Sequence, residues 1–184
     1  MKKQLILIAL ALVGISIGAL TLSHKYLRPT SGMLAVRAPS GYVHAELRDV
    51  EIIGHGSGVI YLAESDGGSV LPIYISEAQA RTIAMLISEA PSQRPFMHDL
   101  MGRLLDYSNL RLEYVSVDKL DDGIYYSTIV IKNGKSFVID ARPSDSIILA
   151  LTKGVPIYIN EELLRKEGIT THPPVDVIRR GFPV

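Results

Sequence analysis

The sequence predicts an α+β domain with a largely antiparallel sheet that is built from hairpins and packed by three to four helices, after one N-terminal transmembrane helix. Three observations lead to this class. Short segments alternate apolar and polar residues, glycine-containing turns join such segments as hairpins, and other segments carry apolar residues at helical spacing. A chain of 184 residues without cysteine is long enough to bury a core without disulfide bonds.

An apolar run, Leu5–Leu22, follows Lys2 and Lys3 and contains no charged residue. At ~1.5 Å per residue this run spans ~27 Å, close to the thickness of the hydrocarbon core of a bilayer. A signal peptide usually has a shorter apolar region and a cleavage site of small residues, and the sequence up to Ser23 is a poor site. We therefore expect residues 1–28 to be a single-pass anchor in the lipid bilayer, with a cleaved signal peptide as the alternative.

Basic residues flank both ends of the apolar run, so the positive-inside rule decides little about orientation. The short basic start is typical of an export-type signal-anchor, which favours a domain outside the cytoplasm. Four of the 19 basic residues and none of the 19 acidic residues lie within residues 1–33, so the rest of the chain carries a net charge of about −4. A generic nucleic-acid binder has the opposite sign, so any nucleic-acid activity requires a local basic site.

Three strands are expected first. Alternation predicts a strand that includes Val43–Leu47, and two apolar runs, Val59–Leu62 and Val70–Ile75, lie on either side of the turn Asp66–Gly68. Because proline cannot donate a ladder hydrogen bond, Pro72 indicates that the third strand lies at an edge or begins there.

Two helices follow these strands. Ser76 is expected to cap the first helix with Gln79 as its capping-box partner, and apolar residues recur at helical spacing over Ala80–Ile87. Prolines within residues 91–95 break the chain before the second helix, which is expected to end near Asn109. The residues of this second helix that we expect to point inward are Leu100, Leu104 and Leu105.

Three more strands, a third helix, a last strand and a short helix complete the predicted order. The strands fall within residues 110–117, 124–132 and 136–140, and Asn133-Gly134 is the strongest hairpin signal in the chain. Pro143 begins the third helix and Gly154 stops it, a strand occupies residues 156–159, and Asn160 caps a helix over residues 161–167. The predicted divisions are an anchor at 1–28, a linker at 29–41, a domain at 42–160, and a C-terminal helix and tail at 161–184.

Two segments share a design that could carry chemistry. Arg94–Leu100 opens the second helix and Asp140–Ser146 opens the third, and each places Arg before Pro, then Asp near the start of the helix. Because helix N-termini attract anions, we expect phosphate groups to be bound by Arg94, Arg142 and Ser144. The expected catalytic residues are His98, Asp99 and Asp145. The expected ligands of Mg²⁺ or Mn²⁺ are Asp99, Asp140 and Asp145.

The same residues also have a purely structural interpretation. An aspartate near a helix N-terminus stabilises the helix dipole by ~0.3–1 kcal/mol without any catalytic role. Ser144 and Asp145 could satisfy free backbone amides, and Arg94 and Arg142 could form ion pairs with the aspartates. The sequence does not establish that the two segments converge.

Four motifs, taken in order and spacing, give a resemblance to a known family. They are Leu71–Ile75 followed by Glu77-Ala78, Arg94-Pro95-x-x-His98-Asp99-Leu100, Asp140-Ala141-Arg142-Pro143-Ser144-Asp145, and Gly154–Tyr158. With these motifs, residues 42–159 resemble the bifunctional nuclease domain family. The chain departs from the family at Met97, where members usually carry Thr, and at Ser146, where they usually carry Ala.

The resemblance implies a nuclease that hydrolyses phosphodiester bonds of DNA, RNA or both, and it suggests a homo-oligomer. Together with the apolar run, it leads us to expect a membrane-anchored, divalent-metal-dependent nuclease with nucleic acid as its substrate. The membrane segment is itself a departure, because members of the family are mostly soluble and intracellular. The alternative is a non-catalytic binding or assembly module, in which the same Arg, Asp and His side chains form a structural network.

Overall fold

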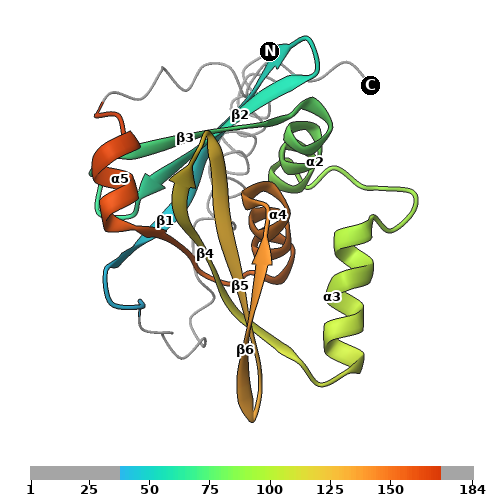
Figure 1. The fold of residues 1–184 in the computed structure, drawn as a ribbon. Coiled ribbons are helices and arrows are strands. Elements are labelled where there is room, and N and C mark those ends of the chain that lie inside the picture. Colours follow the sequence, from blue (N-terminus) through green and yellow to red (C-terminus); the bar gives the residue numbers. More distant parts are fainter. Residues whose placement is uncertain (1–37, 171–184) are drawn as a thin grey trace, which may run out of the picture. The chain divides into compact units, whose positions relative to one another are not determined.

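The computed structural model describes residues 38–170, which fold around one mixed sheet of seven strands (Figure 1). The spatial order of the strands is β3-β2-β1-β7-β4-β5-β6. Their bounds are β1 Tyr42–Gly54, β2 Ser57–Glu64, β3 Val70–Ser76, β4 Arg111–Asp121, β5 Ile124–Asn133, β6 Lys135–Ala141 and β7 Ile157–Asn160. Four helices are found in the described part of the chain: α2 Glu77–Ile87, α3 Met97–Tyr107, α4 Pro143–Lys153 and α5 Glu161–Glu167.

Tight turns make most neighbouring strands antiparallel. The turn between β1 and β2 has His55 and Gly56 at positive φ, and the turn between β5 and β6 has Gly134 at φ 66°. Glycine takes this left-handed conformation at little cost, so the Asn133-Gly134 signal is realised as a hairpin. The only parallel pair within residues 38–170 is β4 with β7, because β7 returns to the centre of the sheet after α4.

The core lies between the sheet and helices α2 and α4, which contact each other and are drawn together in Figure 1. The α2 stripe Ala80, Ile83 and Ala84 is buried, as its helical spacing predicts. It packs with sheet residues such as Ile60 and Leu62, each of which is fully buried. Burying one such aliphatic side chain contributes about 1.5–3 kcal/mol, so this layer holds α2 and α4 firmly in place.

The sheet curls, so that strands far apart in its order approach each other. The Tyr125 hydroxyl on β5 donates a hydrogen bond of 3.2 Å to the Pro72 carbonyl on β3. Helix α5 contacts β3, β4 and β7, and its Leu163 and Leu164 are buried in the same core. The curled sheet carries the main hydrophobic core, and a second, small buried cluster consists of Val59, Tyr61, Ala63 and Val70.

The two edges of the described sheet, β3 and β6, differ in protection. β3 carries Pro72, as expected of an edge strand, and Val70 forms an additional bridge with Ile169. In β6, residues Lys135 to Asp140 are all exposed. Among the residues that the structure describes, β6 pairs with β5 alone.

The structure confirms the predicted α+β class and the predicted order of strands and helices. It contradicts the predicted orientation of the second helix, because Leu100 and Leu104 of α3 are exposed and only Leu105 is buried. Helix α3 packs on α4 through the face that carries Gly102 and Leu105, so its larger apolar side chains point the other way.

The predicted membrane anchor, residues 1–28, and most of the predicted C-terminal tail lie outside the described residues. Within residues 38–170, no helix combines the length and the apolar character that are needed to cross a bilayer.

Candidate active site

The first candidate segment lies where the linker from α2 enters α3. Phe96 is the N-cap with an extended backbone, so the helix begins at Met97 rather than at Pro95. The carboxylate oxygen Oδ2 of Asp99 accepts a 2.8 Å hydrogen bond from the Phe96 backbone N–H. Asp99 therefore stabilises the start of α3, which is one half of a capping box.

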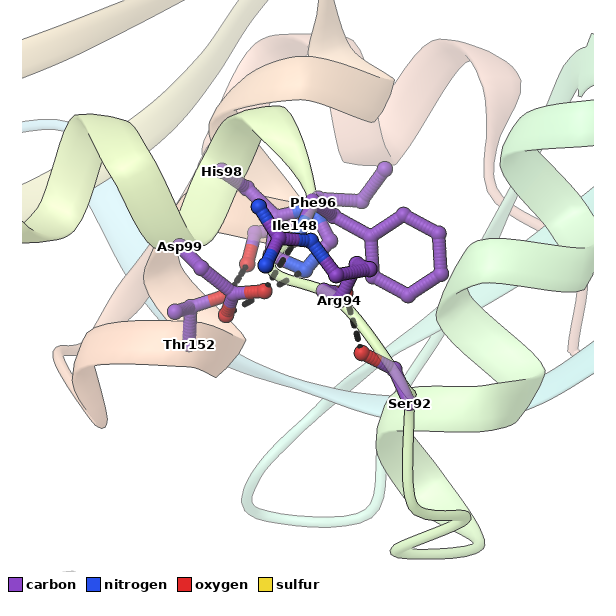
Figure 2. A network of polar contacts seen from close by, with 7 residues as sticks. All are labelled: Ser92, Arg94, Phe96, His98, Asp99, Ile148 and Thr152. Atoms are coloured by element: carbon purple, nitrogen blue, oxygen red, sulfur yellow. Dashed lines mark hydrogen bonds and ion pairs between the residues drawn. The ribbon is translucent and has the colours of Figure 1, made fainter.

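His98 is held close to this capped end. Its ring stacks on the ring of Phe96, with centroids 5.4 Å apart and an interplanar angle of 14°, as Figure 2 shows. The side chain is 11% exposed, and its buried Nε2 atom has no hydrogen-bond partner among residues 38–170. The nearest carboxylate oxygen is Asp99 Oδ1, at 3.8 Å. An unsatisfied buried polar atom costs about 1–3 kcal/mol, which makes His98 a candidate for a role other than stability.

A small pocket of about 190 Å³ lies beside this pair, between α2 and α3. Its lining residues are Thr82, Met85 and Leu86 of α2, Ala90 and Ser92 of the linker, and Phe96, His98 and Asp99. Cavities for whole ligands are typically about 300–1,000 Å³, so this pocket is too small for a nucleotide. It is large enough for a reacting group and a few water molecules.

The second candidate segment begins α4, and its aspartate is tied to α2. Arg142 is the N-cap, Pro143 is the first helical residue, and Asp145 lies in the first turn. Asp145 Oδ1 accepts a 3.1 Å hydrogen bond from the Gln79 side-chain amide. The oxygen of that same amide accepts a hydrogen bond from the Ser76 hydroxyl, so the N-termini of α2 and α4 are joined by one chain of polar contacts.

Ser144 and Ser146 both lie in the core at this helix start. Ser144 is only 4% exposed, so contact between its hydroxyl and a phosphate in solution would require movement of the helix. Ser146 donates to the Pro143 carbonyl and shares a 2.6 Å hydrogen bond with Ser127 of β5. Ser146 stands where members of the resembled family usually carry alanine. The Ser127 and Pro143 contacts satisfy its additional hydroxyl.

The two arginines are the most available cations of the candidate segments. Both side chains are exposed, and neither forms an ion pair with a carboxylate in the described part of the chain. Asp140 is also exposed, on the edge strand β6 opposite Thr128. The arginines are therefore free to bind an anion, and the ion-pair network that the structural interpretation predicts for Arg94 and Arg142 is not present among these residues.

The two candidate segments begin different helices, and each lies near a different part of α2. They do not merge into one cluster. Along α2, Gln79 contacts Asp145, and Thr82 and Met85 line the pocket of His98 one to two turns later. At ~1.5 Å per residue, that separation is about 5–9 Å along the helix. Within residues 38–170 no three His, Asp or Glu side chains come close enough to hold a metal ion. The predicted ligands Asp99, Asp140 and Asp145 thus do not form a preassembled metal site.

Two polar residues of the site, Thr82 and Ser92, belong to none of the sequence motifs, and Gln79 is predicted from the sequence only as a cap. Ser92 donates a 2.5 Å hydrogen bond to the Arg94 carbonyl and shapes the linker, as Figure 2 shows. Thr82 lies three residues after Gln79, and its only signal in the sequence is a polar side chain next to the apolar stripe of α2. Packing between helices determines which of these residues belong to the site, and local sequence patterns do not reveal it.

Comparison with known proteins gives a family. A model of the bifunctional nuclease domain matches residues 60–172. Two uncharacterised proteins of Mycobacterium tuberculosis, from strains CDC 1551 and H37Rv, are each 34% identical over 111 residues, which cover 60% of this chain and 66% of each relative. This chain therefore spans slightly less than two thirds of the length of these relatives.

Plant proteins are more distant relatives. Bifunctional nuclease 1 of Arabidopsis thaliana is 27% identical over 115 residues, which cover 60% of this chain and 35% of the plant protein. Bifunctional nuclease 2 of Oryza sativa subsp. japonica is 24% identical over 120 residues, which cover 63% of this chain and 37% of the plant protein. In both cases the similarity is confined to about a third of the plant protein.

Proposed function

This chain belongs to the bifunctional nuclease domain family, and on that premise we propose that it is a membrane-anchored nuclease that hydrolyses phosphodiester bonds of DNA, RNA or both. One observation supports the proposal most. Within residues 38–170, Arg94 and Arg142 are exposed without carboxylate partners before α3 and α4, and His98 in the first turn of α3 has a buried Nε2 atom without a hydrogen bond. Cations and an unbonded imidazole nitrogen are the groups that phosphodiester hydrolysis uses.

In the proposed reaction, the two guanidinium groups hold the scissile phosphate and its neighbour. Each guanidinium presents a planar fork of N–H donors that matches two phosphate oxygens. Because the two arginines precede different helices, we assign them to two successive phosphates rather than to one. Arg94 is the closer of the two arginines in sequence to the pocket residues His98 and Asp99.

His98 acts as the general base. Because Nε2 is shielded from solvent, the ring must first turn to bring a nitrogen to the pocket. A water in the 190 Å³ pocket then gives its proton to the imidazole while its oxygen attacks phosphorus, and the ester P–O bond breaks. The imidazolium then returns the proton to the leaving oxygen. Asp99 Oδ1, at 3.8 Å from Nε2, stabilises the imidazolium by charge, and its other oxygen remains on the Phe96 N–H.

In the proposed reaction, a divalent metal ion binds only together with the substrate. The described carboxylates do not form a cluster of three, so residues 38–170 hold no preassembled metal cage. Mg²⁺ is commonly bound by one or two carboxylates together with substrate phosphates, and the exposed Asp145 and Asp140 fit that role. Bound in this way, Mg²⁺ or Mn²⁺ would neutralise phosphate charge.

The alternative, a non-catalytic binding or assembly module, is favoured by two other observations. Asp99 and Asp145 already accept hydrogen bonds that a structural role explains. The net charge of about −4 outside residues 1–33 is also unfavourable for a protein that approaches nucleic acid. A binding module would leave Asp99 as a helix cap and Asp145 as the partner of Gln79, and it would use the arginines to bind an anionic partner.

An activity assay on the full chain in detergent separates the two functions. Single-stranded DNA and RNA are incubated with Mg²⁺, Mn²⁺ or EDTA, and cleavage is followed on gels. We expect cleavage that His98→Ala lowers by at least ~10²-fold, the usual contribution of a general base. Arg94→Ala and Arg142→Ala should weaken cleavage, whereas Arg103→Ala, an exposed arginine on the same helix α3, should not.

The outcomes of this assay are distinct. Wild-type cleavage by a folded His98→Ala variant would show that the active site is elsewhere. Binding without cleavage under all metal conditions would favour the binding module. If Arg103→Ala also lost activity, the activity would depend on the total positive charge of the protein rather than on Arg94 and Arg142.

The membrane anchor is tested by fractionation. With the uncharged run Leu5–Leu22 as an uncleaved anchor, the chain should stay in membranes at full-length mass after carbonate extraction. Recovery of a soluble product shortened by ~22 residues would mean that the run is a cleaved signal peptide.

A further inference from the structure

Helix α3 leaves an apolar face open to solvent. Its five large exposed apolar side chains recur at helical spacing and are between 44% and 84% exposed: Met97, Leu100, Met101, Leu104 and Tyr107. The opposite face, with Gly102 and Leu105, is the one that packs inward. An amphipathic helix normally buries its apolar stripe, so this stripe is expected to meet a partner.

Strand β6 carries a second apolar surface, on the edge that no other described strand pairs with. Phe137, Val138 and Ile139 are consecutive and between 44% and 72% exposed. Phe137 and Ile139 border a hollow of about 520 Å³, which is also lined by Leu110, three residues after the end of α3. The α3 end and β6 therefore adjoin the same hollow, and Figure 1 shows both at the same end of the domain.

We propose that β6 pairs antiparallel with β6 of a second copy of this chain, around a two-fold axis at Val138, and that the α3 stripe extends the interface. The sequence of β6 supports a second copy of the chain as its pairing partner. A two-fold axis perpendicular to the sheet keeps every side chain on its own face, so only residues of equal parity can be opposed. An axis at Val138 opposes all seven residues of β6, Lys135–Ala141.

The opposed residues are complementary in this register. Phe137 of one copy meets Ile139 of the other, and the Ser136 hydroxyl meets the Asp140 carboxylate. Lys135 meets Ala141, and so no two like charges are opposed. The axis residue Val138 meets its own equivalent in an apolar contact, as the two-fold symmetry requires of the residue at the axis.

The exposed area is sufficient for a stable dimer. Eight large apolar side chains of ~150–200 Å² each, about half exposed, present roughly 600–800 Å². A stable interface takes about 800 Å² from each partner, and the largest apolar patch on a typical monomer is about 300–600 Å². The other edge is less suited to pairing, because β3 contains Pro72 and its Val70 already pairs with Ile169.

The experiment uses the absence of cysteine from the chain. Val138→Cys places one thiol at the proposed axis, where opposed Cβ atoms lie about 4.5–5.5 Å apart. Tyr74→Cys is the matched control, since Tyr74 on β3 is 71% exposed and Val138 is 72% exposed. With a short bis-maleimide and the full chain in detergent, we expect at least ten times more covalent dimer from Val138→Cys than from Tyr74→Cys.

A second pair of variants tests the pairing without cross-linking. Val138→Lys opposes two ammonium groups at the axis and should halve the protein mass measured by sedimentation equilibrium, with an unchanged circular dichroism spectrum. Tyr74→Lys should leave the mass unchanged. Equal cross-linking of the two cysteine variants would overturn the proposal, as would a folded Val138→Lys chain that remains a dimer. A further set of variants combines Val138→Cys with a second cysteine in residues 1–37 or 171–184. An intramolecular adduct in such a variant would show that β6 contacts its own chain and would also overturn the proposal.

Discussion

Asp99 has two carboxylate oxygens with different environments, and this division lets one residue serve both stability and chemistry. Oδ2 accepts from the Phe96 N–H at 2.8 Å, and Oδ1 lies 3.8 Å from the buried His98 Nε2. The first contact needs only an acceptor, whereas the second needs a negative charge. Substitutions that keep the acceptor and remove the charge can therefore separate the two roles.

For this reason Asp99→Asn and Asp99→Ala should differ. Asparagine keeps an oxygen for the Phe96 N–H, so we expect it to cost about 0.3–1 kcal/mol, the loss of charge at a helix start. Alanine also loses the hydrogen bond and should cost about 1–2 kcal/mol in urea unfolding. Both variants should lose cleavage if the charge supports His98. Full activity in Asp99→Asn would limit Asp99 to a capping role.

The position of α2 on the sheet depends on close contact at a glycine of β2. A Cβ added at Gly58 would lie 2.5 Å from the Ala80 Cβ and 2.9 Å from the Glu51 carbonyl oxygen. Both neighbours are part of, or attached directly to, the backbone of another element, so neither can move alone. Gly58 thus fixes the distance between β2 and the helix that presents Gln79 and Thr82 to the site.

Gly58→Ala should therefore destabilise the fold by about 1–3 kcal/mol, the usual cost of overpacking. The control is Gly102→Ala in α3, where the added Cβ would meet only the flexible Lys153 side chain at 3.2 Å. Since alanine favours a helix over glycine by about 0.5–1 kcal/mol, this control should be neutral or stabilising. Urea midpoints of the two variants that shift equally would contradict the packing argument.

At the scale of the whole molecule, tyrosines spread over the sheet share one electrostatic feature. Burial raises the pKa of Tyr42, Tyr114 and Tyr158 on β1, β4 and β7, and the Asp118 carboxylate raises the pKa of Tyr42 further. Asp118 is held in place by hydroxyl donors from Tyr42, Ser116 and Thr128. The folded state therefore holds the phenol protons more tightly than the unfolded state does.

This difference predicts an alkaline limit to stability. A raised folded-state pKa contributes stability that is present below the unfolded value of ~10 and is lost as the pH rises through the folded value. The free energy of unfolding in urea should change little between pH 7 and 9 and fall above pH ~10. Tyr42→Phe should reduce the slope of that fall. An unfolding free energy that rises above pH 10 would contradict the assignment.

The sequence alone determined the elements and their order, because each has a local signal that tertiary contacts did not override. Ser76 and Asn160 cap their helices, Gly154 ends α4 in the left-handed conformation, and Asn133-Gly134 makes a hairpin. These outcomes depend on neighbouring residues in the chain and on backbone geometry. The candidate arginines and His98 could be named for the same reason, since their motifs are contiguous.

Only the tertiary structure decided how these elements face one another. The apolar residues of α3 are spaced so that either of two helix faces could point inward. Packing on α4 buries the face with Leu105 and leaves Leu100 and Leu104 exposed. Likewise, the pairing of Gln79 with Asp145 is set by how α2 and α4 pack, and the relative position of the two arginine segments is set by how α3 packs on α4. Such contacts join residues 66 positions apart, and no local pattern encodes a contact over that separation.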